Sequence, residues 1–324
     1  MNRWLLLIPV VLYAYVLGAD DYYVMFATRA MILAIFALSL NLLVGYGGLM
    51  SLGHSAFFGI ASYTVAWLIV KKEWNPGEAV LCALALSTSA AGLFGVLALR
   101  ARGIGFLMIT LALGQIVWGI AVRWVDLTGG DNGIRGVVRP VVFGVELDDA
   151  RSFYAFTGAI FFGVCVAIGC IVRSPFGASL RGTRDQPRRM SALGFNVWLI
   201  RWSAFVLAGF LAAVAGILDV YLNKFVSPEV VSLSLSAQAL LMVIVGGSST
   251  LMGPVLGTIV VLVFGHFVAA VIDRWTTALG VLFVAIVMFM PDGLLPGALR
   301  LWARSRGGAE GGSTVRTPIA EERA

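Results

Sequence analysis

The sequence predicts an all-α integral membrane protein with about ten transmembrane helices, some of them broken. Of its 324 residues, 60% are hydrophobic and 12% are charged, and the mean hydropathy is +0.93. A soluble domain of this length does not need so much apolar surface, whereas a helical membrane protein does. The apolar runs are about 20 residues long and lack the alternation of barrel strands, which excludes a β-barrel.

Ten apolar stretches follow one another along the chain, and each is a candidate membrane span. They cover residues 4–19, 22–44, 51–70, 79–99, 104–124, 152–172, 201–218, 236–252, 255–272 and 275–290. The first stretch also resembles a signal peptide, but a retained span agrees better with the topology. We therefore expect one transmembrane domain over residues 1–300. The Gly-, Ser- and charge-rich residues 301–324 are expected to form a disordered cytoplasmic tail.

Residues 173–201 form a basic island between two of these stretches. They contain six arginines and a single acidic residue, Asp185. Because arginines mark cytoplasmic loops, residues 173–200 are predicted to form a cytoplasmic loop. Both termini then fall in the cytoplasm, and the segments 126–151 and 219–229 fall outside. Lys71 and Lys72 are the main exceptions to this charge rule.

The basic island also contains the signals of a short helix. Asp185 is expected to cap its N-terminus, and Pro187 suits the first turn. Residues 188–193 would continue the helix, and Gly194 could end it. A short amphipathic helix at the membrane face is typical of a docking element.

Two glycine-rich interruptions fall between closely spaced spans, at residues 45–54 and 246–254. They are either short turns or helix breaks that are buried in protein or line a path through the membrane. The residues that could lie on such a path are Asn41, Gly48, His54, Gln115, Gly246 and Gly247. For the polar members, an interhelical hydrogen bond is the competing interpretation.

The sequence contains no recognisable catalytic, metal-binding or nucleotide-binding motif. Its two histidines, His54 and His266, are far apart, and its three cysteines lie inside apolar runs. We therefore expect no catalytic residue, metal or cofactor in this chain. Because no phosphate loop is present, the chain should not hydrolyse ATP itself. The acidic residues are confined to loops and span edges, which argues against a proton- or sodium-coupled carrier. The net charge of +6 fits cytoplasmic arginines better than nucleic-acid binding.

Four stretches resemble the LivM-type permease subunit of ABC importers for branched-chain amino acids. Residues 51–60 (SLGHSAFFGI) resemble the family's SLGxAxFFGIGAY segment. Residues 102–112 (RGIGFLMITLA) resemble RGxYFAxxTLA, with Gly105 replacing an aromatic residue. Residues 128–134 (TGGDNGI) resemble TGGxxGI, and residues 246–257 resemble GGxGTxxGPxxGA. The resemblance extends over residues 25–297.

The resemblance implies an ABC importer permease fold in a bacterial inner membrane. In the family, the loop after Phe176 docks on the ATPase. The coupling residues would be Arg181, Arg184, Asp185, Arg188, Arg189, Ala192, Leu193 and Gly194. Residues 186–189 (QPRR) depart from the family pattern, which affects the details of this docking. The implied partners are a LivH-type second permease, two ATPase subunits that hydrolyse ATP, and an extracytoplasmic substrate-binding protein.

The implied function is ATP-driven import of hydrophobic amino acids by alternating access. Residues 126–151 are a candidate docking surface for the binding protein or an ordinary solvated loop. A permease for urea or short amides is the near alternative. A self-sufficient carrier or channel, or a membrane enzyme, is more remote.

Overall fold

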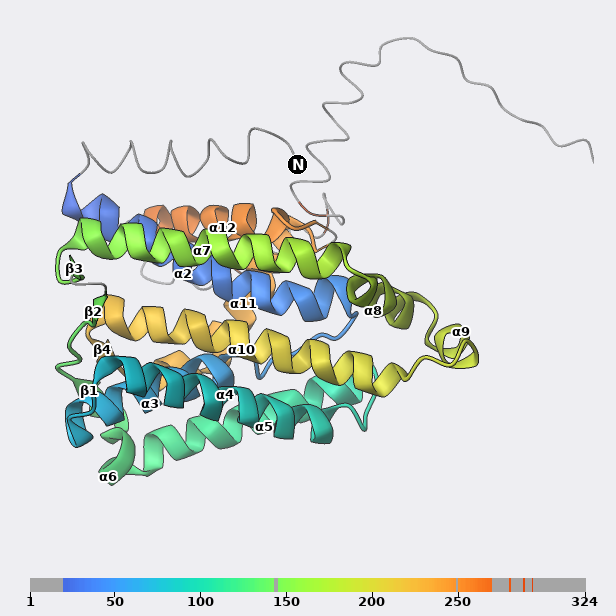
Figure 1. The fold of residues 1–324 in the computed structure, drawn as a ribbon, viewed down its shortest axis with the longest axis horizontal. Coiled ribbons are helices and arrows are strands. Elements are labelled where there is room, and N and C mark those ends of the chain that lie inside the picture. Colours follow the sequence, from blue (N-terminus) through green and yellow to red (C-terminus); the bar gives the residue numbers. More distant parts are fainter. Residues whose placement is uncertain are drawn as a thin grey trace, which may run out of the picture.

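The computed structural model describes residues 20–142, 145–248 and 250–269, together with the single residues Gly280, Met288 and Gly293. Helices form most of this part of the chain and run side by side along one axis (Figure 1). The end of the bundle that carries the short helices α8 (Pro175–Asp185) and α9 (Pro187–Ala192) is called the basic end below. The opposite end, which carries four short strands, is called the strand end.

Eight long elements build the described part of the bundle. They are α2 (Asp21–Asn41) with its π-helical continuation η2 (Leu42–Tyr46), α3 (Ser55–Lys72), α4 (Pro76–Ala98), α5 (Ile104–Arg123), α7 (Ala150–Arg173), α10 (Val197–Asn223), α11 (Leu233–Gly246) and α12 (Gly253–Ala269). By length and composition, five of them can cross a membrane alone: α2 with η2, α4, α5, α7 and α10. The helices α11 and α12 are apolar but shorter.

Helices α2 and α10 form the centre of the bundle. In each of them 78% of the most apolar window is buried, against 22% in α4, α5 and α7. Gly216 lets α10 approach α3 closely, because a Cβ at this position would overlap the backbone oxygen of Phe58. The Ser62 hydroxyl reinforces this contact by donating to the Gly216 carbonyl oxygen at 2.8 Å. The outer helices leave apolar surface for lipid or other subunits.

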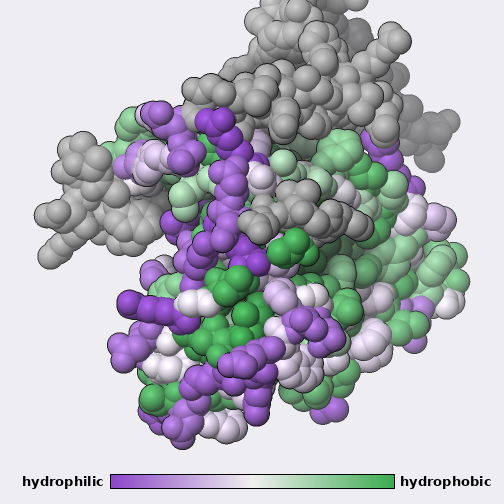
Figure 2. Space-filling view, turned by 60° about the vertical axis from the view of Figure 1, so that its left-hand side comes forward, coloured by the Kyte–Doolittle hydropathy of each residue, from purple (hydrophilic) through white to green (hydrophobic). Residues whose placement is uncertain are grey.

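The strand end contains short elements that the all-α expectation did not include. Strand β1 (Ile134–Arg135) pairs with β4 (Phe225–Val226), and β2 (Val141–Val142) pairs with β3 (Val145–Glu146), both antiparallel. One turn of helix, α6 (Val125–Thr128), and two 3-10 turns, η3 (Gly130–Asn132) and η4 (Pro228–Val231), complete this end. Figure 2 brings this side forward and shows hydrophilic side chains spread across it, with hydrophobic side chains beside them. Within the loop before α7, Ile134 and Arg135 are therefore held by pairing with the segment after α10.

Arg139 holds the strand end together. It is 8% exposed, and its guanidinium donates four hydrogen bonds of 2.8–3.2 Å to the carbonyls of Tyr221, Leu222, Leu147 and Asp148. Its Cζ lies 4.4 Å from the centroid of the Phe153 ring. Burial lowers the pKa of this guanidinium, while Asp148 and Asp149 act in the opposite direction. A positive charge at the C-terminus of α10 also complements the helix dipole.

The predicted short helix at the basic end exists, but its N-terminus differs from the expectation. Asp185 is the last residue of α8, and Gln186 precedes α9 without a side-chain capping bond. The assignment of Asp185 as N-cap was therefore wrong, because a helix that begins at Pro175 already includes it. Ser174 caps that helix by accepting from the amide of Gly177. Gly194, with φ of +86°, follows the end of α9 as expected.

Eight of the ten predicted spans coincide with described helices, and several boundaries move. The stretch at 51–70 becomes a helix only at Ser55, and the stretch at 236–252 ends at Gly246. Helix α10 extends beyond 201–218 at both ends. The spans 4–19 and 275–290 and the tail 301–324 lie outside the described residues, apart from Gly280 and Met288.

Asp219 corrects the predicted end of the span at residue 218. It was placed in an outer segment, but it lies in the last turns of α10 and is 8% exposed. Its carboxyl group hydrogen-bonds with the side chain of Asn223, and Arg29 on α2 is the positive charge that acts on it. The apolar run stops at Leu218, whereas the helix continues for another turn.

Candidate functional site

The two glycine-rich interruptions meet inside the basic end. The Asn41 side-chain nitrogen donates to the carbonyl oxygen of Thr250 at 3.1 Å, and these residues are 209 positions apart. A Cβ at Gly45 would overlap both the Ser248 carbonyl oxygen and the Asn41 side-chain oxygen. The backbones can therefore touch only because residue 45 has no side chain. We call this contact between residues 41–48 and 246–253 the glycine junction.

A π-helix forms one half of the glycine junction. In η2 the amide of Gly47 bonds to the carbonyl of Leu42, and the amide of Leu49 reaches back to Leu43. This widened pattern leaves the Gly45 carbonyl free for a partner outside the helix. The partner is the guanidinium of Arg184 on α8, which donates to the Gly45 carbonyl oxygen.

The other half of the junction is the break between α11 and α12. Gly247 has φ of +105°, which favours glycine, and residues 247, 248 and 250–252 form no helix. Gly246 and Gly253 pack against each other so closely that a Cβ on Gly246 would overlap the Gly253 carbonyl. The Thr250 hydroxyl then accepts from the amide of Gly253 at 2.9 Å. The break is thus a compact linker and not an open turn.

Residues 47–54 run back from the end of α2 into the bundle as a non-helical, largely buried segment. Gly53 packs against α5 at Thr110, and the backbone amide of Leu52 lies 3.4 Å from the Thr110 hydroxyl. His54 is fully buried, with its Nε2 atom 2.8 Å from the Ser39 hydroxyl and its ring stacked on Phe36. For His54, these contacts favour an interhelical hydrogen bond over a position on a path through the membrane.

Helix α3 begins inside the bundle, where it meets the start of α11. The amide of Ser55 donates to the Ser236 hydroxyl at 2.9 Å, and the two hydroxyls are 2.8 Å apart. The Ser55 hydroxyl also lies 3.0 Å from the carbonyl oxygens of Val231 and Ser232. Sequence reasoning missed these serines. Their signal was their position at the N-terminal ends of two apolar helices.

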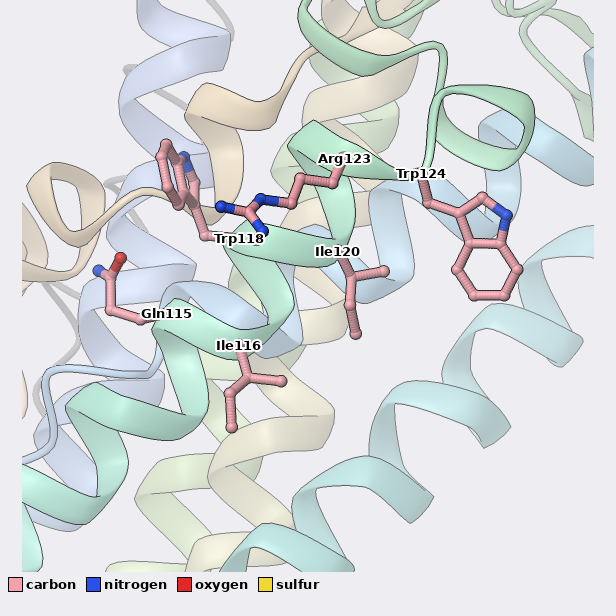
Figure 3. Close-up of a pocket in the computed structure, with 7 residues that line it drawn as sticks. Gln115, Ile116, Trp118, Ile120, Arg123 and Trp124 are labelled. Atoms are coloured by element: carbon pink, nitrogen blue, oxygen red, sulfur yellow. The ribbon is translucent and has the colours of Figure 1, made fainter.

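Gln115 lies apart from the glycine junction, on the exposed face of α5. It borders an open hollow of about 710 Å³ with Ile116, Trp118, Gly119, Ile120, Arg123 and Trp124. Gln115 and Trp118 point to the same side of the helix, and the Arg123 side chain extends back toward Trp118 (Figure 3). An amide and a guanidinium beside apolar rings suit contact with protein or a polar path better than contact with lipid alone.

Six sequence-predicted path residues therefore occupy three places. Asn41, Gly48, Gly246 and Gly247 belong to the glycine junction, His54 lies behind it, and Gln115 faces outward on α5. Among the described residues, no group of three or more His, Cys, Asp or Glu side chains is arranged to hold a metal ion.

The predicted coupling residues differ in whether their side chains bond to the bundle. Arg188, Arg189, Ala192, Leu193 and Gly194 are exposed on α9 and the turn after it. Arg181 donates to the carbonyl oxygen of Val172 at 2.9 Å. Arg184 bonds both to the Gly45 carbonyl and, at 2.8 Å, to the Asp185 carboxylate. Arg181 therefore connects α8 to α7, and Arg184 connects α8 to η2.

Comparison with known proteins gives one family. Residues 22–291 match the family described as the branched-chain amino acid transport system permease component. The chain is 30% identical over 295 residues to the high-affinity branched-chain amino acid transport permease LivM of Salmonella typhimurium, and equally to that of Escherichia coli. Each alignment covers 83% of this chain and 69% of the relative. No solved structure matches.

Proposed function

The chain belongs to the family of branched-chain amino acid transport permease components, and we propose that it is the membrane permease subunit of an ATP-driven importer for branched-chain and other hydrophobic amino acids. The match over residues 22–291 carries this proposal, because it extends across the bundle from α2 to beyond α12. The two bacterial relatives are named for high-affinity transport of the same amino acids.

The energy for import would come from partner subunits, because the sequence has no phosphate loop. We place the basic end in the cytoplasm, where its arginines satisfy the positive-inside rule. The exposed set on α9 would dock on one of the two ATPase subunits. Leu193, 65% exposed beside Arg188 and Arg189, supplies an apolar contact within a basic surface. The strand end then faces the outside and would receive the substrate-binding protein.

The substrate path would run along the α5 hollow, between this chain and a second permease subunit of the LivH type. The neutral amide of Gln115 can bond either charged group of a zwitterion, and Trp118, Ile116 and Ile120 suit an apolar side chain. A hollow that lies open on one side needs a second wall to exclude lipid. The bundle would alternate between outward- and inward-open states as the ATPases close and open.

The test is uptake by the complete complex. The chain is purified with the second permease and both ATPases and reconstituted in liposomes with the binding protein. Radiolabelled leucine, urea and acetamide are offered with and without ATP. We expect ATP-dependent uptake of leucine. ATP-dependent uptake of urea or acetamide alone would favour the amide alternative, and uptake by this chain without ATPase subunits would indicate a self-sufficient carrier.

The α5 path has its own variant pair. Gln115→Leu should raise the KM for leucine uptake, because the amide that bonds the zwitterion is lost. Met108→Leu is the control, since Met108 is exposed on the same helix outside the hollow. Equal KM values for the two variants would remove Gln115 from the path.

A further inference from the structure

We propose that Arg184 is a positioning residue that connects the coupling helices α8 and α9 to the glycine junction, so that movement of these helices reaches the break between α11 and α12. The proposal rests on the proposed function, since it assigns how ATPase movement enters the bundle. It separates Arg184 from the arginines on α9, which would contact the ATPase directly.

The first step is the attachment of Arg184 to the end of α2. Its guanidinium donates to the Gly45 carbonyl oxygen, which η2 leaves without a helical partner. Hydrogen bonds from a charged donor are stronger than those between neutral groups. A guanidinium at the C-terminal end of a helix also interacts favourably with the helix dipole. The bond is therefore a strong connection between α8 and η2.

The second step is the fit of the arginine stem. Gly48 has φ of +66°, and a Cβ there would lie 2.6 Å from Cγ of Arg184. The aliphatic stem of Arg184 thus occupies the space that a side chain at position 48 would need. Nearby, Leu180 of α8 is fully buried and lies 3.6 Å from where a Cβ of Gly47 would be. Together these contacts seat α8 on the turn that ends α2.

The third step leads from Gly45 to the other half of the junction. The face of Gly45 that would carry a side chain touches the backbone of Ser248, and Asn41 one turn earlier bonds to Thr250. Both contacts are with the linker between α11 and α12. A shift of η2 therefore displaces that linker, because the packed backbones leave no space to absorb the shift.

The remaining attachments of α8 make it able to transmit a displacement. One residue, Ser174, separates α8 from α7, and the Arg201 side chain on α10 donates to the Thr183 carbonyl oxygen at 2.6 Å. The exposed helix α9 follows after Gln186 alone. A displacement of α9 would thus move α8, and the bond from Arg184 to Gly45 would transmit the displacement to η2.

The test measures how many amino acids are transported per ATP hydrolysed by the complete reconstituted complex. Arg184→Met keeps the aliphatic stem and removes the guanidinium. We expect this ratio to fall about tenfold, a change within the range typical for coupling between distant sites. The ATPase subunits should still co-purify and hydrolyse ATP. Arg184→Lys restores a cation and should recover part of the ratio. Arg100→Met, an exposed arginine between α4 and α5, is the control.

A glycine pair tests the same connection without removing the arginine. Gly48→Ala and Gly103→Ala both place alanine at a positive φ, +66° and +58°. A Cβ at Gly48 meets the Arg184 stem, whereas a Cβ at Gly103 has nothing within 4 Å. We expect the transport ratio to fall in Gly48→Ala and to stay near wild type in Gly103→Ala. This pair decides the matter if Arg184→Met does not accumulate in the membrane.

Three results would overturn the inference. One is an unchanged transport ratio in both Arg184→Met and Gly48→Ala. Another is loss of the ATPase subunits on purification of Arg184→Met, because Arg184 would then be a docking residue. The third is a wild-type complex without ATP-dependent amino acid uptake, which would overturn the proposed function and the inference with it.

Discussion

Arg139 offers the sharpest test of how the strand end is stabilised. The substitution Arg139→Met keeps a long apolar stem beside Phe153 and removes the guanidinium. Four carbonyl groups then lose a charged donor. The carbonyls of Tyr221 and Leu222 belong to the last turn of α10 and the other two to the loop before α7. The variant should therefore loosen the contact between these two segments.

The size of the effect follows from the hydrogen bonds and the burial. A hydrogen bond to a charged group contributes about 1.5–3 kcal/mol, but four bonds from one guanidinium cannot be summed. Burying that charge also costs several kcal/mol, and removing it relieves this cost. Leaving a buried carbonyl without a donor costs about 1–3 kcal/mol. We expect a total of about 3 kcal/mol, because several carbonyls lose their donor while the cost of burying the charge is relieved.

Hydrogen–deuterium exchange of the purified chain in detergent measures this local loss. Peptides that cover residues 134–141 and 221–226 should exchange about 100-fold faster in Arg139→Met than in wild type, since 1.4 kcal/mol corresponds to a factor of ten. Arg135→Met is the control, because Arg135 is exposed on the same segment and its Cζ lies 5.2 Å from the Phe225 ring centroid. Equal exchange in the two variants would refute the role given to Arg139.

Two further predictions concern the packing of α5 and the charge pair at the strand end. Gly114→Ala should destabilise the isolated chain by about 1–3 kcal/mol in thermal unfolding, because its Cβ would lie 3.0 Å from the Gly53 Cα. Gly119→Ala, with nothing within 4 Å of its Cβ, should be neutral or stabilising, and equal losses would contradict this packing argument. The Lys224 ammonium lies 2.7 Å from the Asp148 carboxylate and holds the pKa of that carboxyl group below its ordinary value. The stabilisation from this ion pair is therefore fully present above about pH 3.9, the ordinary pKa. It is lost as the pH falls through the lowered pKa, because the carboxylate becomes protonated. The melting temperatures of wild type and Lys224→Met should therefore differ near neutral pH and converge in acid, and a constant difference would argue against the pair.

The membrane helices could be predicted from the sequence because their signal is local. Long apolar runs mark the helices, whereas the direction in which they cross the membrane stays a prediction from the basic island. The ends of helices were less predictable where a polar residue lies inside one. Asp219 ended the predicted span because it is charged, yet the helix continues around it and buries it against α2. Asp185 similarly looked like a helix start because the longer helix before it was not expected.

The contacts between distant segments were not predictable from local patterns. Glycine at position 45 is compatible with a turn, a break or a close approach. The choice depends on Ser248, which lies about two hundred residues later in the chain. The pairing of β1 with β4 likewise joins two residues on each strand, too few to leave a strand pattern. The bond from Arg184 to the Gly45 carbonyl was not predictable, because nothing nearby in sequence indicates a free carbonyl in η2.

The serine contact between α3 and α11 has a mechanical consequence for the bundle. Ser55 and Ser236 are both buried, and the amide of Ser55 donates to the hydroxyl of Ser236. Separating the N-terminal ends of α3 and α11 would leave a buried amide and two hydroxyl groups without hydrogen-bond partners. Each unpaired group costs about 1–3 kcal/mol. The starts of the two helices are therefore hard to separate, so that a displacement of the N-terminus of α3 should be accompanied by the same displacement of the N-terminus of α11.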